Sequence, residues 1–460
     1  MTAQPTDSSD AIQNSTAPDS GGRLGLTELV DLVRAILAGC WIVLGLFNIP
    51  KVLLWLSPSF IYQKDMICEY LVARAIASQT DPFLPIQVLA GRYLTGPAIS
   101  TFDHPTPHPP TLALLSYPLV FLDYPTAATV WLVLEVISLV AAIYLLGRLA
   151  GFHLPVGWTL SITIMSLAWF PVLQELQRGQ VGILLLLLLT GFYLSLRSNR
   201  FFVGGMLLGI SILVKQIAWP VIILLLLRKR WNILLGAASV VLPGYLLMLQ
   251  VIGFGSLARY FVEVLPQVSA LYRNLIWNFS LWTIGFRLFG GTTGIISPPL
   301  VQLPSAAPIA SVVVPAIALL VACYLTRTPF DLEWGIGVML CLSTVVNPVA
   351  WPHYLVIMLP IVALVTRQLI GRGFPMRETS LAFLVGALLF VDHPRWEIWA
   401  FNIAGQTPAI EGGLSVLPFA PALFLLGPVV AVTALAWLCL ILGRQGHNLE
   451  WTPKVIGLSH

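Results

Sequence analysis

A short polar stretch directly after the first long apolar run holds the residues best suited to chemistry at a membrane surface. It reads Tyr62-Gln63-Lys64-Asp65-Met66-Ile67-Cys68-Glu69-Tyr70. Charged residues make up only 10% of the chain, yet two carboxylates and a lysine lie here within six positions. A carboxylate within hydrogen-bond reach of a hydroxyl can act as its general base. Asp65 is therefore a candidate base, or else a cap for the helix that follows it. Glu69, one turn further on, is interpreted as a solvated helix residue.

Lys215 is the second candidate, because it interrupts an otherwise apolar run. A charge inside a membrane span costs roughly 2.5–3.5 kcal/mol, so such a residue usually faces a cavity and has a partner. A phosphate at the membrane surface suits a point cation. The alternative is that the lysine extends to the interface and leaves only its stem in the apolar layer.

Two further segments place polar groups between apolar spans. The turn Glu175-Leu176-Gln177-Arg178-Gly179-Gln180 offers an amide that suits sugar hydroxyls, or is a plain hairpin turn. His353 follows two prolines and is a candidate for phosphate binding or proton transfer, or a histidine with structural hydrogen bonds alone. Nearby aromatic rings can stack on sugars, although interfacial belts explain most of them. The residues expected to gather on one external face are Asp65, Glu69, Glu175, Gln177, Arg178, Gln180, Lys215, Asn347, His353 and Tyr354.

The sequence does not indicate a metal site or a disulfide framework. The segment Phe102-Asp103-His104-Pro105-Thr106-Pro107-His108-Pro109-Pro110 has two histidines, but its prolines prevent simple ligand geometry. Four of the five cysteines, all but Cys68, fall in apolar spans, where they are expected to be small buried residues. We expect neither a metal nor an organic cofactor.

The composition is that of a polytopic, all-α membrane protein. Of the 460 residues, 57% are hydrophobic, and the mean hydropathy is +0.87. A soluble protein of this length would need far more surface charge. The net charge of +4 says little about partners, and nothing in the sequence indicates nucleic acid.

The apolar runs predict about twelve transmembrane helices. They lie near residues 33–56, 126–147, 156–173, 181–196, 202–214, 217–228, 232–252, 307–325, 334–346, 354–370, 379–391 and 416–442. On this assignment, one side of the membrane receives the basic residues Arg148, Arg197, Arg200, Arg228, Lys229, Arg230, Arg327, Arg367, Arg372, Arg377 and Arg444. Positive charge marks the cytoplasmic side. The loops 57–125, 253–306 and 392–415 are then external.

The loops and ends carry further expectations. Runs 202–214 and 217–228 are short for a membrane core of about 30 Å, so they are expected to end below the surface and leave an external cavity for Lys215. Residues 64–79 predict an amphipathic helix on the membrane, and 111–122 and 281–289 re-entrant or interfacial segments. Residues 1–28 are expected to be a disordered cytoplasmic tail, 29–445 the transmembrane domain, and 446–460 a second cytoplasmic tail.

In this order, these motifs resemble glycosyltransferase family 87, the GT-C membrane enzymes that depend on polyprenyl-phosphate-mannose. The similarity covers roughly residues 33 to 370. It rests on Asp65 with Tyr70, on Asp81-Pro82-Phe83, on Pro109-Pro110 and on Gly179-Gln180-Val181. It continues with Lys215 in Gly-x-x-Leu-Gly-Ile-x-x-Leu-x-Lys and with Asn347-Pro348, Trp351, His353 and Tyr354. The chain departs from the family at Gly182, where asparagine is common, and in the distance from Lys215 to Pro220.

The resemblance implies a GT-C-like bundle and an inverting transfer of a hexose, mannose, from a lipid phosphate to a lipid-linked or cell-envelope acceptor. Asp65 would be the base, and Lys215 and His353 would lie near the donor phosphate. The implied substrate-binding set also includes Gln180, Tyr70, Glu175, Arg178, Asn347, Trp351 and Tyr354. The site would face the outside of the cell membrane. A lipid flippase or small-solute transporter is the alternative class, and a transferase for arabinose or an aminosugar is a third.

Overall fold

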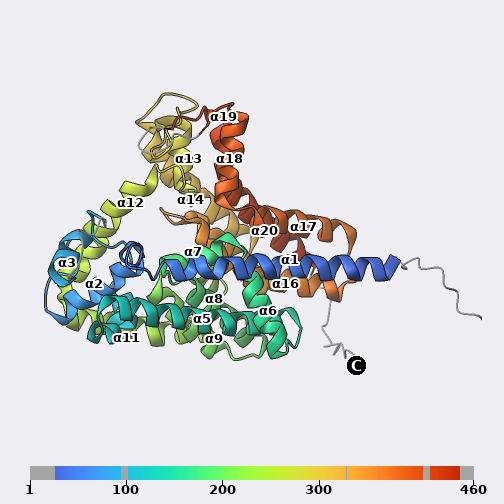
Figure 1. Cartoon of the computed structure of the whole chain (residues 1–460), viewed down its shortest axis with the longest axis horizontal. Helices are drawn as coiled ribbons and strands as arrows, with labels where there is room; N and C mark the ends of the chain where they lie inside the picture. The colour runs from blue at the N-terminus through green and yellow to red at the C-terminus, as the bar shows by residue number, and fades with distance from the viewer. Residues whose placement is uncertain (1–25, 95–101, 328, 408–414, 446–460) are drawn as a thin grey trace, which may run out of the picture. The chain divides into compact units, whose positions relative to one another are not determined.

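The computed structural model describes residues 26–94, 102–327, 329–407 and 415–445 (Figure 1). Of the two predicted tails, only residues 26–28 lie within these ranges. The chain divides into two compact units, one ending at Trp41 and one beginning at Ile42. The site lies in the second unit, which the following paragraphs describe. Among the described residues, β-type pairing is limited to two isolated bridges, between Leu275 and Thr293 and between Ile296 and Val416.

The predicted spans coincide with helices. Ten of the matches are α1 (Leu26–Leu54), α5 (Tyr124–Ala150), α8 (Gly182–Arg197), α9 (Phe201–Val214), α10 (Trp219–Leu227), α11 (Trp231–Arg259), α14 (Ala306–Leu325), α15 (Leu332–Val346), α17 (Met376–Phe390) and α20 (Gly427–Gln445). The run 354–370 forms η5 (Pro352–Met358) and α16 (Leu359–Gly371). The run 156–173 is not one helix, because α6 (Val156–Ser166) and α7 (Phe170–Arg178) meet at a bend of 85°.

The predicted count of about twelve spans is not confirmed. By length and hydropathy, six described helices can cross a membrane, or seven if the bent pair α6 and α7 forms one span. The helices α8, α9 and α15 are apolar but have only 16, 14 and 15 residues. At about 1.5 Å per residue, such helices are shorter than a hydrocarbon core of about 30 Å.

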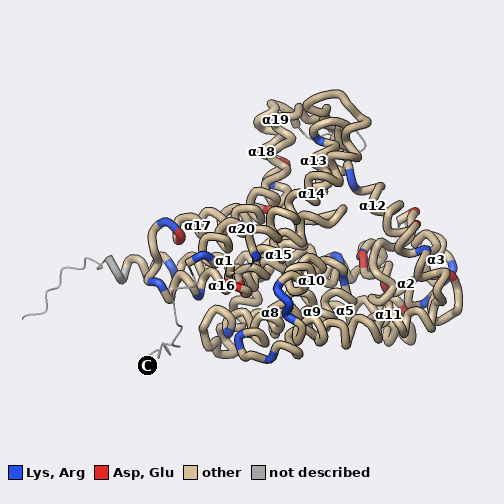
Figure 2. Tube along the Cα trace, turned by 180° about the vertical axis from the view of Figure 1, so that it is seen from behind, with Lys and Arg blue, Asp and Glu red and all other residues tan. Residues whose placement is uncertain are grey.

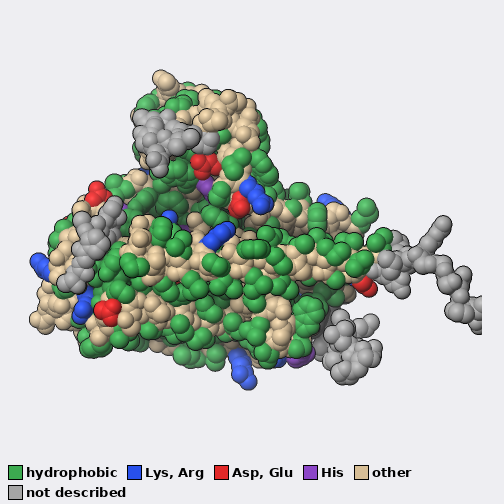
Figure 3. Space-filling model, in the orientation of Figure 1, with side chains coloured by type: hydrophobic (Ala, Val, Ile, Leu, Met, Phe, Trp, Pro, Cys, Tyr) green, Lys and Arg blue, Asp and Glu red, His purple; other side chains and the backbone are tan. Residues whose placement is uncertain are grey.

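The bundle is built from close helix contacts with apolar outer faces. Helices α5, α8, α9 and α11 are neighbours in that order (Figure 1). Helix α15 packs against α20, which packs against α17 (Figure 2). Glycine permits the tightest contact, since a Cβ atom added to Gly205 of α9 would lie 2.0 Å from the Ile233 carbonyl oxygen of α11. Hydrophobic side chains cover most of the visible face (Figure 3). Helix α11, for example, exposes Leu235, Leu242 and Leu246. This is the surface of a protein surrounded by lipid.

One end of the bundle gathers the basic helix termini. Arg197 at the end of α8 pairs with Glu333 at the start of α15, with Nε and Oε1 2.5 Å apart. Arg228 after α10 donates to the Thr326 carbonyl after α14, and Arg372 after α16 donates to Gln445 of α20. Elsewhere along the chain, charged residues are few and scattered (Figure 2). The opposite ends of α8, α10, α15 and α16 adjoin the candidate site residues Gln180, Lys215, Asn347 and Tyr354.

The first long loop is folded into the protein. It contains η1 (Ile61–Gln63), α2 (Met66–Ala77), α3 (Ile86–Tyr93), α4 (Leu112–Ser116) and η2 (Tyr117–Phe121). The helix predicted over residues 64–79 exists as α2, but its predicted location on the membrane is wrong, because nine of its twelve residues are buried inside the chain. Glu69 is one of them, so its assignment as a solvated residue is also wrong. Segment 111–122 forms α4 and η2, which together are too short to span a membrane.

The second predicted loop is partly helical. Helix α11 bends at Gly253, whose φ is +79°, and continues through η3 (Tyr260–Val264) and α12 (Leu265–Arg273). Tyr260, Val264 and Val268 recur at helical spacing and pack on Phe83 from the first loop, which explains why the helix persists. The rest holds the short α13 (Trp282–Gly285) and η4 (Phe286–Gly290). The third loop begins with α18 (His393–Ile403), and α19 (Phe419–Ala422) and η6 (Leu423–Leu426) precede α20.

Candidate active site

A cavity of about 1090 Å³ opens where the first loop, the α7–α8 turn, the α9–α10 junction, α12 and the segment before α16 converge. Eight of the ten predicted site residues line it, and they come from four separate parts of the sequence. They are Asp65, Arg178, Gln180, Lys215, Asn347, Trp351, His353 and Tyr354. Lys215 therefore lines a cavity, as predicted, and the segments predicted to converge do so.

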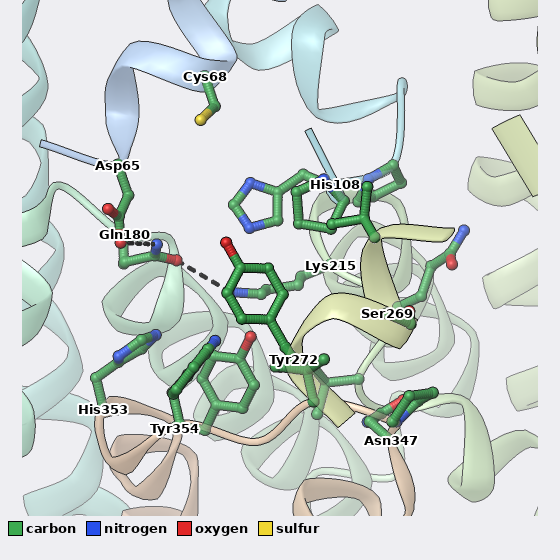
Figure 4. A pocket seen from close by; sticks show the side chains of 18 of the residues that line it. Asp65, Cys68, His108, Gln180, Lys215, Ser269, Tyr272, Asn347, His353 and Tyr354 are labelled. Atoms are coloured by element: carbon green, nitrogen blue, oxygen red, sulfur yellow. Dashed lines mark hydrogen bonds between the residues drawn. The ribbon is translucent and has the colours of Figure 1, made fainter. Parts of the chain in front are cut away.

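Gln180 connects the candidate base to the candidate cation (Figure 4). Its Nε2 donates to Asp65 Oδ2 at 2.8 Å, and its Oε1 accepts from Lys215 Nζ at 3.0 Å. The amide can satisfy both neighbours in one orientation alone, with its oxygen toward the ammonium group and its nitrogen toward the carboxylate. A carboxylate and an ammonium group are thereby held on one wall without forming a direct ion pair.

Lys64 anchors the backbone that carries Asp65. Its side chain is fully buried, and its Nζ donates to the carbonyl oxygens of Leu176 at 2.9 Å and Gln177 at 2.7 Å. Burial lowers the pKa of Lys64 to about 8. Gly179 adopts a left-handed φ of +67° in the turn, where a Cβ atom would lie 2.8 Å from that of Met66. This contact holds the Asp65 segment against the turn that supplies Gln180.

Burial dominates the electrostatics of Asp65. Removal from water raises the pKa of its carboxyl group, while Arg178 and the hydrogen bond from Gln180 oppose that rise. Arg178 Nη1 lies 3.6 Å from Asp65 Oδ1, with its guanidinium over the ring of Trp55. The capping alternative is not supported, because the Asp65 side chain makes no capping hydrogen bond to α2. A partly desolvated carboxylate of raised pKa suits a general base.

Lys215 lies at the break between α9 and α10, where the backbone is extended. Its side chain is buried, and its Nζ lies 4.3 Å from the centroid of the Tyr354 ring. The alternative prediction, that Lys215 extends to the membrane interface, is therefore wrong. Within the described residues, no carboxylate lies within ion-pair distance of it, so its charge is available to an anion in the cavity.

Glu175 and Tyr70 do not line the cavity, contrary to prediction. Glu175 is fully buried behind it, where its Oε2 accepts from the Gly182 backbone at 2.6 Å and its Oε1 lies 4.0 Å from His353 Nε2. Glu175 therefore supports His353 from behind. The Tyr70 hydroxyl donates to the Leu122 carbonyl at 2.7 Å and serves to pack the first loop.

The segment before α16 is held by side chains that the sequence did not single out. Asn278 donates to the Pro348 carbonyl at 2.9 Å and accepts from the Ala350 backbone at 2.8 Å. Asn347 lines the cavity, and its Oδ1 accepts from Trp219 Nε1 at 3.3 Å. These contacts fix the turn from which Trp351, His353 and Tyr354 reach the cavity.

Three further residues that line the cavity were not predicted as site residues. His108, Tyr272 and Cys68 line the cavity, and the buried carboxylate of Glu69 bonds to His108 Nδ1. One signal was available, because Glu69 follows Asp65 by four positions and so lies on the same helix face. Within the described ranges, no three His, Cys, Asp or Glu side chains are grouped to hold a metal ion.

Comparison with known proteins identifies the family. Residues 107–348 match the model of glycosyltransferase family 87, which is more than half of the chain. The chain belongs to glycosyltransferase family 87. As a family 87 member it is a glycosyltransferase, and its apolar helices make it a multi-pass membrane protein. The transporter alternative is thereby set aside.

Curated relatives of this family 87 chain are transferases for two different sugars. The chain is 24% identical to the polyprenol-phosphate-mannose-dependent alpha-(1-2)-phosphatidylinositol pentamannoside mannosyltransferase of Mycolicibacterium smegmatis, over 67% of this chain and 75% of that one. It is 23% identical to an alpha-(1->3)-arabinofuranosyltransferase of Corynebacterium glutamicum, over 53% and 62%. No solved structure matches. The family match includes Gln180 and Lys215 but ends before His353 and begins after Asp65.

Proposed function

We propose that the protein transfers a hexose, mannose, from a polyprenyl-phosphate donor to a lipid-linked or cell-envelope acceptor on the extracytoplasmic face of the cell membrane. The observation that carries the proposal is the chain of contacts from Asp65 through Gln180 to Lys215 in one cavity. It pairs a proton acceptor with a cation, which are the two groups that transfer from a sugar phosphate requires.

In the proposed reaction, Asp65 accepts the proton of the acceptor hydroxyl. The hydroxyl oxygen forms a bond to the anomeric carbon while the bond from that carbon to the phosphate oxygen breaks. The electron pair of the broken bond stays on the leaving polyprenyl phosphate, which gains negative charge. Lys215 stabilises this charge from a buried position, where an electrostatic interaction is stronger than in water. Attack from the side opposite the phosphate inverts the anomeric carbon.

The remaining cavity residues support this assignment. Arg178 adds a second positive charge beside Asp65, and His353 and Tyr354 flank Lys215 on the wall proposed for the phosphate. Apolar side chains such as Ile212, Phe261 and Leu265 line the cavity near α9, η3 and α12 and suit a prenyl chain. An arabinofuranosyl donor is the second candidate, because the arabinofuranosyltransferase of Corynebacterium glutamicum is as similar to this chain as the mannosyltransferase.

The proposal is tested with purified protein in lipid nanodiscs. Radiolabelled polyprenyl-phosphate-mannose or polyprenyl-phosphate-arabinose is supplied with a lipid extract of the source membranes, and labelled lipid product is measured. We expect product from the mannose donor, and Asp65→Asn should lower the rate by about 10²–10⁴-fold. Asp123→Asn is the matched control, because Asp123 caps α5 and asparagine caps a helix equally well.

Each outcome of this experiment has a separate meaning. Product from the arabinose donor alone would change the sugar and leave the mechanism intact. Full activity of Asp65→Asn would remove Asp65 as the base. Absence of transfer from both donors, with a correctly folded protein, would overturn the proposed donor class.

A further inference from the structure

One wall of the cavity is built from two segments that the proposed reaction does not use. His108 comes from the proline-rich segment after α3, and Tyr272 comes from α12. Figure 4 shows both side chains projecting into the cavity. The segment of His108 is held in place, because the Tyr260 hydroxyl donates to the Pro107 carbonyl at 2.9 Å. This wall is as well ordered by contacts as the catalytic one.

The hydrogen bonds of His104 define what Tyr272 offers to the cavity. His104 Nδ1 lies 2.7 Å from the Pro105 carbonyl oxygen, which can only accept, so Nδ1 carries the hydrogen. In the neutral ring, Nε2 is then an acceptor, and it lies 2.6 Å from the Tyr272 hydroxyl. Tyr272 therefore donates its hydrogen to His104. The lone pairs of its oxygen are left to accept a hydrogen bond from a ligand.

His108 is oriented by the same reasoning. Its Nδ1 faces the buried carboxylate of Glu69, which is an acceptor, so Nδ1 carries a hydrogen there too. The second ring nitrogen, Nε2, lies on the far side of the ring from Glu69, where it can hydrogen-bond to a hydroxyl group in the cavity. Glu69 thus acts as the positioning residue for His108, as carboxylates do for histidines in other active sites.

The two walls of the cavity consequently differ in polarity. Lys215 and Arg178 present donors with positive charge, whereas Tyr272 presents an acceptor and His108 presents a ring nitrogen that can pair with a hydroxyl group. The Tyr272 ring also contacts the ring of Trp351, with centroids 5.7 Å apart, so apolar ring surface lies beside these groups. Such groups next to aromatic faces match a sugar or polyol, which has many hydroxyl donors and a C–H face. The charge of Asp65 is close enough to act on both His108 and Tyr272.

We infer that His108 and Tyr272 form the acceptor subsite, and that the acceptor presents a hydroxyl-rich carbohydrate or polyol headgroup with one hydroxyl directed toward Asp65. This inference rests on the proposed function. It assigns the two walls to the two substrates: the donor phosphate contacts the Lys215 wall, and the acceptor headgroup contacts the His108 wall.

The test uses octyl α-mannoside as the acceptor probe in nanodiscs. His108→Asn keeps a donor toward Glu69 and removes Nε2, and Tyr272→Phe removes one oxygen atom. We expect each variant to raise the apparent KM for octyl α-mannoside about three- to tenfold, the effect of one lost hydrogen bond. The apparent KM for the donor should stay within twofold. Tyr144→Phe is the matched control, because Tyr144 is exposed on α5 and contacts Arg148.

A binding measurement without donor separates this inference from the proposed function. Octyl α-mannoside binding is followed by saturation-transfer NMR, and we expect Tyr272→Phe to weaken it by the same factor. If wild-type protein binds the mannoside but transfers nothing, the proposed function fails and the subsite stands. If wild-type protein turns over while both variants keep their KM and binding for the mannoside, or lose affinity for the donor instead, the acceptor subsite is overturned.

Discussion

At the scale of single residues, the surroundings of Asp65 matter as much as its identity. Burial raises the pKa of its carboxyl group, with a smaller contribution in the same direction from Glu69. Arg178 and the hydrogen bond from Gln180 act in the opposite direction. The net shift is upward, so the pKa of Asp65 lies above that of an ordinary aspartate, which is about 3.9.

This shift predicts a pH dependence. A general base works when it is deprotonated, so kcat/KM should fall on acidification through the pKa of Asp65, above the ordinary aspartate range. Gln180→Leu removes the hydrogen bond that lowers this pKa, so the acid limb should move to higher pH. The measurement is initial transfer rate between pH 4 and pH 8. Gln63→Leu is the control, because Gln63 donates to the Ser59 carbonyl instead. An acid limb that is the same in all three proteins would contradict this account.

Residue types and order predicted most of this site, and the failures have a geometric reason. Asp65 was predicted as a carboxylate at the membrane surface, Gln180 as a turn amide suited to hydroxyls, and Lys215 as a charge inside an apolar run that needs a partner. Tyr70 was chosen for its place in a motif, but five positions along a helix from Asp65 turn it away from the cavity. Its hydroxyl bonds to Leu122 instead. Helical periodicity instead places Glu69, four positions along, on the same helix face as Asp65.

At the scale of elements, the turn from α7 to α8 depends on a glycine. A Cβ atom added to Gly182 would lie 2.3 Å from Glu175 Oε1 and 2.5 Å from its Cδ. The buried carboxylate occupies the space that a side chain at position 182 would need. The glycine that stands where the family commonly has asparagine is therefore required by the packing of Glu175 behind His353.

Gly182→Ala should therefore destabilise the protein. Overpacking of this kind costs about 1–3 kcal/mol, and it should displace Glu175 and with it His353. We expect a lower Tm in nanodiscs together with a lower transfer rate. Gly157→Ala in α6 is the matched control, because no atom lies within 4 Å of the added Cβ and alanine favours the helix. In Gly182→Ala combined with Glu175→Ala, the loss of Tm should be smaller than the sum of the two single losses. Strict additivity would show that the two positions do not interact.

The positions of the helices were predictable from hydropathy, but the bends within helices and the continuation of a helix into a predicted loop were not. The run 156–173 contains Pro171 at the start of α7, which favours a helix break, but hydropathy alone does not reveal the 85° bend between α6 and α7. The continuation of α11 past Gly253 depends on Tyr260 and Val264 packing on Phe83, a contact between segments far apart in the sequence. A glycine and a polar stretch there favoured a loop on local grounds, and tertiary packing decided otherwise.

At the scale of the whole molecule, composition was sufficient for the class and insufficient for the count of spans. A chain with 10% charge and long apolar runs has to be a membrane protein. Whether a 14-residue helix such as α9 crosses the bilayer depends on its neighbours and on the cavity at its end, which hydropathy does not describe. The role of His108 was hidden for the same reason, since its partner Glu69 lies 39 positions away.

The arrangement also predicts which face of the membrane the cavity meets. Basic helix termini gather at the end of the bundle opposite the cavity, and positive charge is retained in the cytoplasm. We introduce single cysteines at Asp103, in the segment that lines the cavity, and at Ser198, after α8 at the basic end, in a Cys40→Ser background. Both positions are exposed. A membrane-impermeant maleimide should label Asp103→Cys in intact cells and Ser198→Cys only after permeabilisation. The reverse pattern would move the reaction to the cytoplasmic face while leaving the family and the chemistry of the cavity unchanged.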